Sequence, residues 1–154
     1  MATINAILNI SSADLSSSPL ALTKTMTMTK AGSSNGLEFT SGLVRRKLTA
    51  VTAIDLVTVG EQMYGTPTAS KANKLYVKNT GSSSTDYVEI AIGDSAADSG
   101  EELLATGGNS KITLGKLFGG DWMLIPFEGS TSNDIIVTPS TAEVTTIEWM
   151  LFFE

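Results

Sequence analysis

The sequence predicts an all-β protein, and two features carry that prediction. Apolar and polar residues alternate with a period of two along most of the chain, which is the pattern of strands with one buried face. Ser and Thr together fill 38 of the 154 positions, 18 and 20 respectively. Thr favours half-buried pleated surfaces, and Ser favours turns. Helical periodicity is nearly absent, so we expect strands throughout.

Residues 1–49 are expected to form an N-terminal extension or arm with two to three strands of its own. Alternation predicts a first strand over 3–10 and a second over 19–30, where leucines and methionines share one face and threonines the other. An Asn-Gly pair predicts a turn over 31–36, followed by a short returning strand. Residues 42–60 are then one long strand or two bent ones.

Residues 50–154 are expected to form the main domain, an eight-stranded jelly-roll-like β-sandwich. Strand-like segments separated by turn residues recur about every 8–12 residues, which is typical of sandwiches and barrels. Eight strands in two sheets is the number in a jelly roll. The predicted strands are 51–59, 74–79, 86–93, 102–106, 111–118, 121–127, 134–138 and 144–153. Residues 102–106 would equally suit a short helical turn.

The stretch LYVKNTGSSSTDYVEIAIGD, residues 75–94, predicts a hairpin. Two alternating runs flank a loop of Gly, Ser, Thr and Asp. Leu75 and Val77 would share a core face with the apolar residues of the second run. Lys and Glu residues would pair across the opposite face.

Composition excludes several chemistries. The chain has no Cys and no His, so disulfides, thiolate metal sites and Ser-His-Asp or Cys-His triads are impossible within it. The N-terminus has no basic region typical of a secretory signal, and no apolar run approaches the roughly 20 residues of a membrane helix. We expect a soluble protein made in a cytoplasm, with no membrane partner.

Charge is distributed unevenly along the chain. Residues 1–80 carry eight Lys/Arg and four Asp/Glu, whereas residues 81–154 carry two Lys and twelve Asp/Glu, giving +4 and −10. So acidic a half makes nucleic acid a poor partner, because phosphate contacts need a positive footprint. Opposite charges instead favour docking on further copies or on another protein.

Candidate sites for chemistry are weak. A glycosidase needs two carboxylates in a geometry that the sequence does not fix. The candidate carboxylates are Asp94, Asp98, Glu101, Glu102 and Asp121. The loop 94–102 offers oxygens to Ca²⁺ but lacks the spacing of a calcium-binding loop. No glycine-lysine segment matches a phosphate-binding loop. We therefore predict no catalytic residue, no cofactor, no metal and no small-molecule substrate.

Two segments are candidates for partner binding. Arg45, Arg46 and Lys47 form the only basic cluster, which suits contact with an acidic partner surface or an anionic polymer, or else a solvated strand end or loop. The last strand is apolar on both faces, because Met150 and Phe152 lie opposite its core side. We expect the N-terminal extension or another subunit to cover that outer face. Both Trp residues sit in apolar runs, and core packing is predicted for them.

Residues 70–154 resemble small jelly-roll virion proteins of tailed bacteriophages. The resemblance lies in the LYVKN strand with its Ser/Gly/Thr loop, the WMLIPF strand, the DIIV strand and the closing VTTIEWMLFFE. It implies a non-enzymatic capsid decoration, or cement, protein on the virion surface, made in the cytoplasm of the host bacterium. It also implies an oligomer, with a trimer favoured, that binds the major capsid protein.

The alternative hypothesis is recognition, by a phage tail or fibre module or by a carbohydrate-binding β-sandwich. Sugar sites use exposed aromatic rings with polar groups beside them. Tyr64, Tyr76, Tyr87 and Trp122 are the aromatic residues that could serve as platforms. A third hypothesis is a hydrolase that uses two of the carboxylates.

Overall fold

The computed structural model describes residues 3–13, 20–29, 39–49, 51–57, 73–93, 111–127, 134–141 and 145–153. Every regular element in these ranges is a β-strand, so the predicted all-β class is confirmed. The chain divides into two compact units, Met1–Glu38 and Phe39–Glu154. None of the described segments forms a helix long and apolar enough to cross a membrane.

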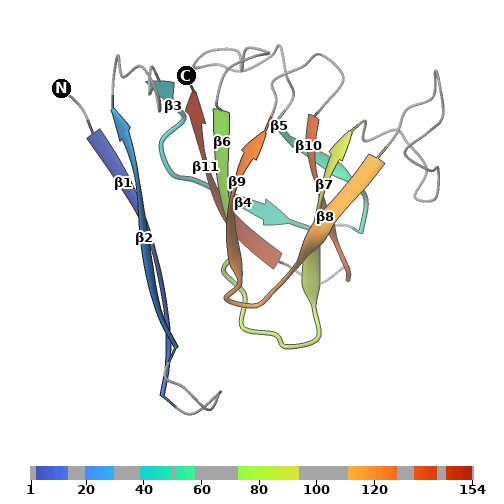
Figure 1. The fold of residues 1–154 in the computed structure, drawn as a ribbon. Helices are drawn as coiled ribbons and strands as arrows, with labels where there is room; N and C mark the ends of the chain where they lie inside the picture. Colours follow the sequence, from blue (N-terminus) through green and yellow to red (C-terminus); the bar gives the residue numbers. More distant parts are fainter. Residues whose placement is uncertain are drawn as a thin grey trace. The chain divides into compact units, whose positions relative to one another are not determined.

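The described part of the first unit is a two-stranded antiparallel hairpin of β1 (Thr3–Ser12) and β2 (Leu20–Thr29) (Figure 1). Its register is unbroken, from Thr3 opposite Thr29 to Ser12 opposite Leu20. Because side chains alternate along a strand, most apolar residues share one face and most Thr and Asn residues share the other. Both strands overlap the two ranges in which alternation predicted strands.

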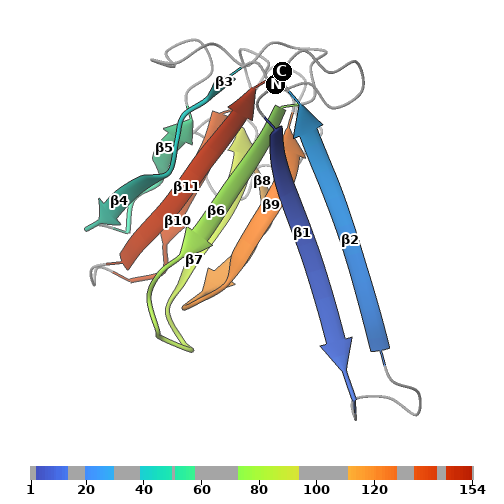
Figure 2. The same cartoon turned by 90° about the vertical axis from the view of Figure 1, so that its left-hand side faces the viewer.

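The second unit contains two antiparallel sheets (Figure 2). The front sheet consists of β3 (Phe39–Thr40), β4 (Val44–Leu48), β11 (Thr145–Phe153), β6 (Asn73–Asn79) and β9 (Trp122–Phe127). The back sheet has the order β5 (Ile54–Val57), β10 (Asp134–Pro139), β7 (Tyr87–Gly93) and β8 (Lys111–Phe118). In the front sheet β11 is central, because β3 and β4 pair with one of its edges and β6 with the other.

The pairing is nested along the sequence. β4 pairs with β11, β5 with β10, β6 with β9 and β7 with β8, all antiparallel. Successive pairs alternate between the front and back sheets. The second unit is therefore one long double ribbon folded across itself, so that strands far apart in sequence become neighbours.

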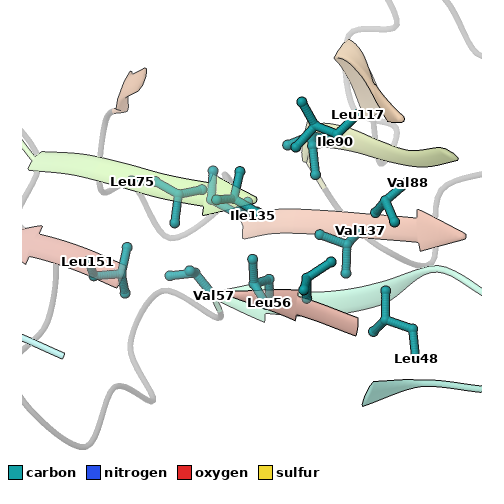
Figure 3. Packing of buried hydrophobic residues seen from close by; sticks show 12 residues of the cluster. Leu48, Leu56, Val57, Leu75, Val88, Ile90, Leu117, Ile135, Val137 and Leu151 are labelled. Carbon is teal, nitrogen blue, oxygen red and sulfur yellow. The ribbon is translucent and has the colours of Figure 1, made fainter. Parts of the chain in front are cut away.

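The core lies between the two sheets, as Figure 3 shows for residues of both. Leu75 and Leu151 project from the front sheet, and Ile90, Ile135 and Val137 from the back sheet; all five are fully buried. Each comes from the apolar phase of an alternating strand, which is why period-two alternation predicted the core face correctly. The two sheets form a β-sandwich.

The predicted hairpin of residues 75–94 is wrong in its pairing. β6 belongs to the front sheet and β7 to the back sheet, so the segment crosses the sandwich as an arch. The predicted Lys–Glu pairing across it does not occur, since Glu89 lies opposite Lys116 and Lys78 opposite Glu148. The core face was still predicted correctly, because arches and hairpins require the same inward residues.

Hydrogen bonds from a buried side chain hold the arch. Asn79, at the end of β6, is buried; its Nδ2 donates to the carbonyl of Leu117 over 3.0 Å, and its Oδ1 accepts from the Gly81 amide over 2.9 Å. The Gly119 amide donates to the carbonyl of Ser83 over 2.9 Å. A Cβ built on Gly119 would lie 2.5 Å from the Ser83 nitrogen. Only glycine allows the β8–β9 turn to approach the arch so closely.

The sandwich begins earlier in the chain than predicted. The described residues of the range 42–60 form two strands in different sheets, β4 and β5, and β3 lies before them. Because β3 and β4 pair with β11, the boundary between the two compact units falls between Glu38 and Phe39. The prediction had placed it after residue 49. The predicted segment 102–106 lies outside the described residues.

Candidate interaction surface

The outer face of the front sheet carries the residues best suited to contact a partner. Strand register arranges them in rows across the sheet. The first row is Arg45, Glu148, Lys78 and Trp122; the second is Met150, Tyr76 and Leu124; the third is Phe152, Lys74 and Pro126. We call these three rows the outer face. Arg45 and Trp122, at the ends of the first row, are exposed, whereas in the third row Phe152 and Lys74 are buried and Pro126 is exposed.

The first row alternates in charge and ends in an aromatic residue. Arg45 Nε donates to Glu148 Oε1 over 2.6 Å, and the two side chains are 73% and 13% exposed. Lys78 lies opposite Glu148 on the other side of β11 and opposite Trp122 of β9. Trp122 is 49% exposed. The carboxylate is thus flanked by two cations, and the indole faces solvent at the sheet edge.

The second row is half-buried and mostly apolar, and Tyr76 lies at its centre. The rings of Tyr76 and Trp122 have centroids 6.4 Å apart and planes tilted by 39°. Burial, and then the negative charge of Glu148, raise the pKa of Tyr76 above its ordinary value of 10.0. Both causes disfavour the phenolate, so Tyr76 presents a neutral hydroxyl at all physiological pH values.

The predicted basic cluster is divided by the strand it lies on. Arg45 and Lys47 belong to the outer phase of β4, opposite Glu148 and Thr146. Arg46 has the opposite phase, and its Nη1 donates to the carbonyl of Asp55 on β5 over 3.1 Å, which links the edges of the two sheets. With Arg45 paired to Glu148, the three residues form no concentrated cationic patch.

The two predicted apolar contact residues have different surroundings. Met150 is half-buried in the second row, and Phe152 is buried with 8% exposure. Met150 is therefore partly accessible to a partner, whereas Phe152 is not. The structure places Arg45 and Met150 on one face of the front sheet, which also carries Tyr76 and Trp122. The sequence had predicted the basic cluster and the last strand as two separate contact sites.

The predicted core packing of the Trp residues is right for Trp149 and wrong for Trp122. Trp149 packs against the core cluster. In β9, however, Met123 and Ile125 take the inward positions, which leaves Trp122 and Leu124 on the outer face. The run WMLIPF is apolar in both phases, so its inward phase cannot be read from hydrophobicity alone.

A second aromatic group lies on the back sheet, where Tyr87 and Phe118 are paired. Their ring centroids are 5.5 Å apart at an interplanar angle of 62°, and Lys116 Nζ lies 4.3 Å from the centroid of the Tyr87 ring. Phe118, Ile112 and Leu114 are exposed on β8, the edge strand of the back sheet. Sequence reasoning missed this exposed edge, although no sequence signal distinguishes an edge strand from a central one here.

Asp121 is the candidate acid that lies within the described residues, and its carboxylate closes a turn. Asp121 Oδ2 accepts a hydrogen bond from the Phe118 amide over 3.0 Å and so closes the β8–β9 turn. Among the described residues no group of three or more acidic side chains is placed to hold a metal ion. Asp94, Asp98, Glu101 and Glu102, and with them the candidate calcium loop 94–102, lie outside the described residues, as does Tyr64.

Comparisons with family models, with curated proteins and with solved structures gave no match.

Proposed function

We propose that this chain is a non-enzymatic structural protein of a virion, of the capsid decoration type, which binds the major capsid protein and stabilises the assembled shell. The nested strand pairing is interpreted as a jelly roll, whose two sheets follow the same alternation of pairs. The proposal rests on the resemblance of residues 70–154 and on the chemistry of the outer face.

The residue types of the outer face carry the proposal. Protein–protein interfaces are enriched in Trp, Tyr, Met and Arg, and the outer face contains one of each: Trp122, Tyr76, Met150 and Arg45. They lie on a regular sheet face, backed by a packed core. A rigid surface loses little conformational entropy on binding, so more of the contact energy is retained.

Trp122 is the expected anchor. It combines the largest side chain on this face with 49% exposure, and Trp is among the commonest hot-spot residues of interfaces. Lys78 lies opposite Trp122 on the neighbouring strand, and Arg45 lies at the other end of the same row in its ion pair with Glu148. Such charged residues would set orientation and association rate more than affinity. Because the protein binds only assembled capsid, mass action would stabilise the shell against disassembly.

The experiment adds purified protein to capsids assembled without it and measures binding and resistance to heat. Trp122→Ala should weaken binding by about thirtyfold, the range of an interface anchor. Ile112→Ala is the matched control, since it removes an exposed apolar side chain from the back sheet. A wild-type protein that neither binds capsids nor protects them would refute the proposal.

The exposed indole also favours a second candidate, carbohydrate recognition. Trp122 offers an aromatic face for a sugar ring, with the Lys78 ammonium and the Tyr76 hydroxyl on the neighbouring strand. Against it, the two rings are tilted by 39° and Tyr76 is half-buried, so only one ring presents a platform. A glycan array decides: hits that disappear with Trp122→Ala would favour this candidate over capsid binding.

A further inference from the structure

The two sheets of the second unit end in edge strands. Among the described strands, β4 and β9 end the front sheet, and β5 and β8 end the back sheet. An edge strand presents backbone N–H and C=O groups that no neighbouring strand uses, so it can pair with a strand of another molecule. β8 is the longest of the four, with eight residues, and its Ile112, Leu114 and Phe118 side chains are exposed. Strand addition would therefore be expected first at β8.

β8 contains one residue more than regular pairing with β7 requires. Gly115 lies opposite Ile90 of β7. Thr113 lies opposite Ala91, the next residue of β7, which leaves Leu114 as the extra residue of a β-bulge. A bulge bends its strand and disrupts the even spacing of the backbone groups along it. A regular strand arriving from another molecule could therefore not match the free side of β8 along its whole length.

Lys116 adds a charge to the same edge, two residues after the bulge. Its side chain is exposed, and its Nζ lies 4.3 Å from the centroid of the Tyr87 ring on β7. Lys is prominent among the residues that protect natural edge strands, because an added strand would take the ammonium group out of water. The bulge and the charge together interrupt the middle of the strand.

The other edge strands carry different obstacles to pairing. β4 has three consecutive exposed cations, so the predicted basic cluster of Arg45, Arg46 and Lys47 lies on an edge strand. β5 has only four residues, and Arg46 Nη1 donates to the carbonyl of Asp55 on this strand. β9 contains Pro126, which has no N–H to donate to an added strand. Charges, short length and proline each oppose strand addition.

We propose that these four edges are closed to strand addition, so that a partner contacts side chains of the outer face and not the backbone of an edge strand. The inference deepens the proposed function by naming the mode of contact, and its second half rests on that function. Copies bound to one lattice would meet at a high local concentration. Closed edges would keep such copies from joining one another through their sheets.

Opening the β8 edge tests the inference. Deletion of Leu114 removes the extra residue and retains every residue of β8 that has a partner on β7, and Lys116→Val removes the charge. The double variant should self-associate at least about tenfold more strongly than wild type, because an uninterrupted edge can form several cross-strand pairs with a second copy. Sedimentation velocity over a range of concentrations measures this reversible association. Amide hydrogen exchange should show protection within residues 111–118 that rises with concentration.

Two further variants serve as matched controls. Leu114→Ala keeps the extra residue and Lys116→Arg keeps the charge, so both should associate as wild type does. If the double variant does not fold, as judged by circular dichroism, Lys116→Val alone decides. That variant changes one exposed side chain and should still raise association severalfold. A folded variant with an opened edge that associates no more than wild type, or controls that associate as strongly as it does, overturns the proposal.

Capsid binding of the same variants is measured separately, at low protein concentration. Because β8 belongs to the back sheet, Leu114 deletion and Lys116→Val should leave capsid binding unchanged, whereas Trp122→Ala weakens it. Weaker binding of the β8 variants would show that the partner uses this edge and would overturn the inferred mode of contact. Capsids that do not bind the wild-type protein would refute the proposed function, while sedimentation still decides whether the edge is closed.

Discussion

Arg45 and Glu148 lie directly opposite each other on β4 and β11, and their side chains form an ion pair with Nε and Oε1 2.6 Å apart. The two residues are 103 positions apart in sequence. The pair therefore forms only when β4 and β11 come together in the front sheet, and its carboxylate also acts on Tyr76 of the neighbouring strand β6.

Arg45→Ala should change stability little. The Arg45 side chain is 73% exposed, and exposed ion pairs contribute about 0–1 kcal/mol because water screens them and side-chain entropy opposes them. We expect a loss below about 1 kcal/mol in the free energy of urea unfolding. A loss above about 2 kcal/mol would mean that Glu148 behaves as a buried charge in need of its partner.

Glu148→Gln should lower the pKa of Tyr76 without restoring its ordinary value, because burial, the larger cause, persists. The folded pKa lies above 10.0, so the unfolded tyrosine ionises first as pH rises. The contribution of Tyr76 to stability is therefore fully present below pH 10.0 and is lost as pH rises through the folded pKa.

Measuring unfolding free energy in alkaline buffers tests this pH dependence. Tyr76→Phe should make the decline above pH 10.0 shallower, while Tyr87→Phe serves as a control for loss of a tyrosine hydroxyl. Identical alkaline slopes for wild type and Tyr76→Phe would contradict the assignment to Tyr76.

Asn79→Ala should destabilise the sandwich by about 2–3 kcal/mol. The substitution leaves the Leu117 carbonyl and the Gly81 amide without the side chain that now bonds them, at a buried site. Thr80→Ala is the control, since its exposed hydroxyl donates to the Thr146 carbonyl over 2.8 Å and should cost below about 1 kcal/mol. Equal losses in chemical denaturation would show that the arch does not depend on Asn79.

Gly119→Ala should cost more than Gly42→Ala. An added Cβ at Gly119 would meet backbone atoms of Ser82 and Ser83 at 2.5–2.7 Å, so the turn or the arch must move. Gly42 has a φ of 69° but open space around it, so its substitution adds only backbone strain, about 1 kcal/mol. Thermal unfolding compares the stabilities of the two variants. A larger loss of stability in Gly42→Ala than in Gly119→Ala would contradict the close approach of the turn to the arch.

Fluorescence distinguishes the two Trp residues. Trp149→Phe leaves only Trp122, whose emission should be red-shifted and readily quenched by acrylamide because the indole is 49% exposed. Trp122→Phe leaves the core-packed Trp149, which should emit at shorter wavelength and resist quenching. Similar quenching of both variants in dilute, unassociated protein would contradict the exposed position of Trp122.

The strands were predictable because they depend on local alternation, but their partners were not. The segments that became β6, β7, β8, β9, β10 and β11 were each placed within one or two residues. Assigning β6 and β7 to one hairpin failed because a hairpin and an arch bury the same side chains. The choice depends on long-range contacts, such as the bond from the Thr80 amide to the Thr146 carbonyl.

The outer face was predictable only in part, for a related reason. Met150 was identified because β11 is apolar in both phases, but its companions Tyr76 and Trp122 come from strands that only the fold brings beside it. Trp122 was assigned to the core because β9 has no polar residue to mark its outer phase. Arg46 was grouped with Arg45 although the pleat sends the two side chains to opposite faces.

The central position of β11 has a consequence for how the domain folds. β11 is the last strand in sequence, yet it joins β4 to β6, so the front sheet has no continuous middle before β11 is in place. Contacts this distant in sequence fold slowly, since long loops must close first. We expect the β7–β8 pair to form early and the β4–β11 pair to form last. Nascent chains that lack β11 should therefore expose the unpaired edges of β4 and β6 to chaperones and proteases.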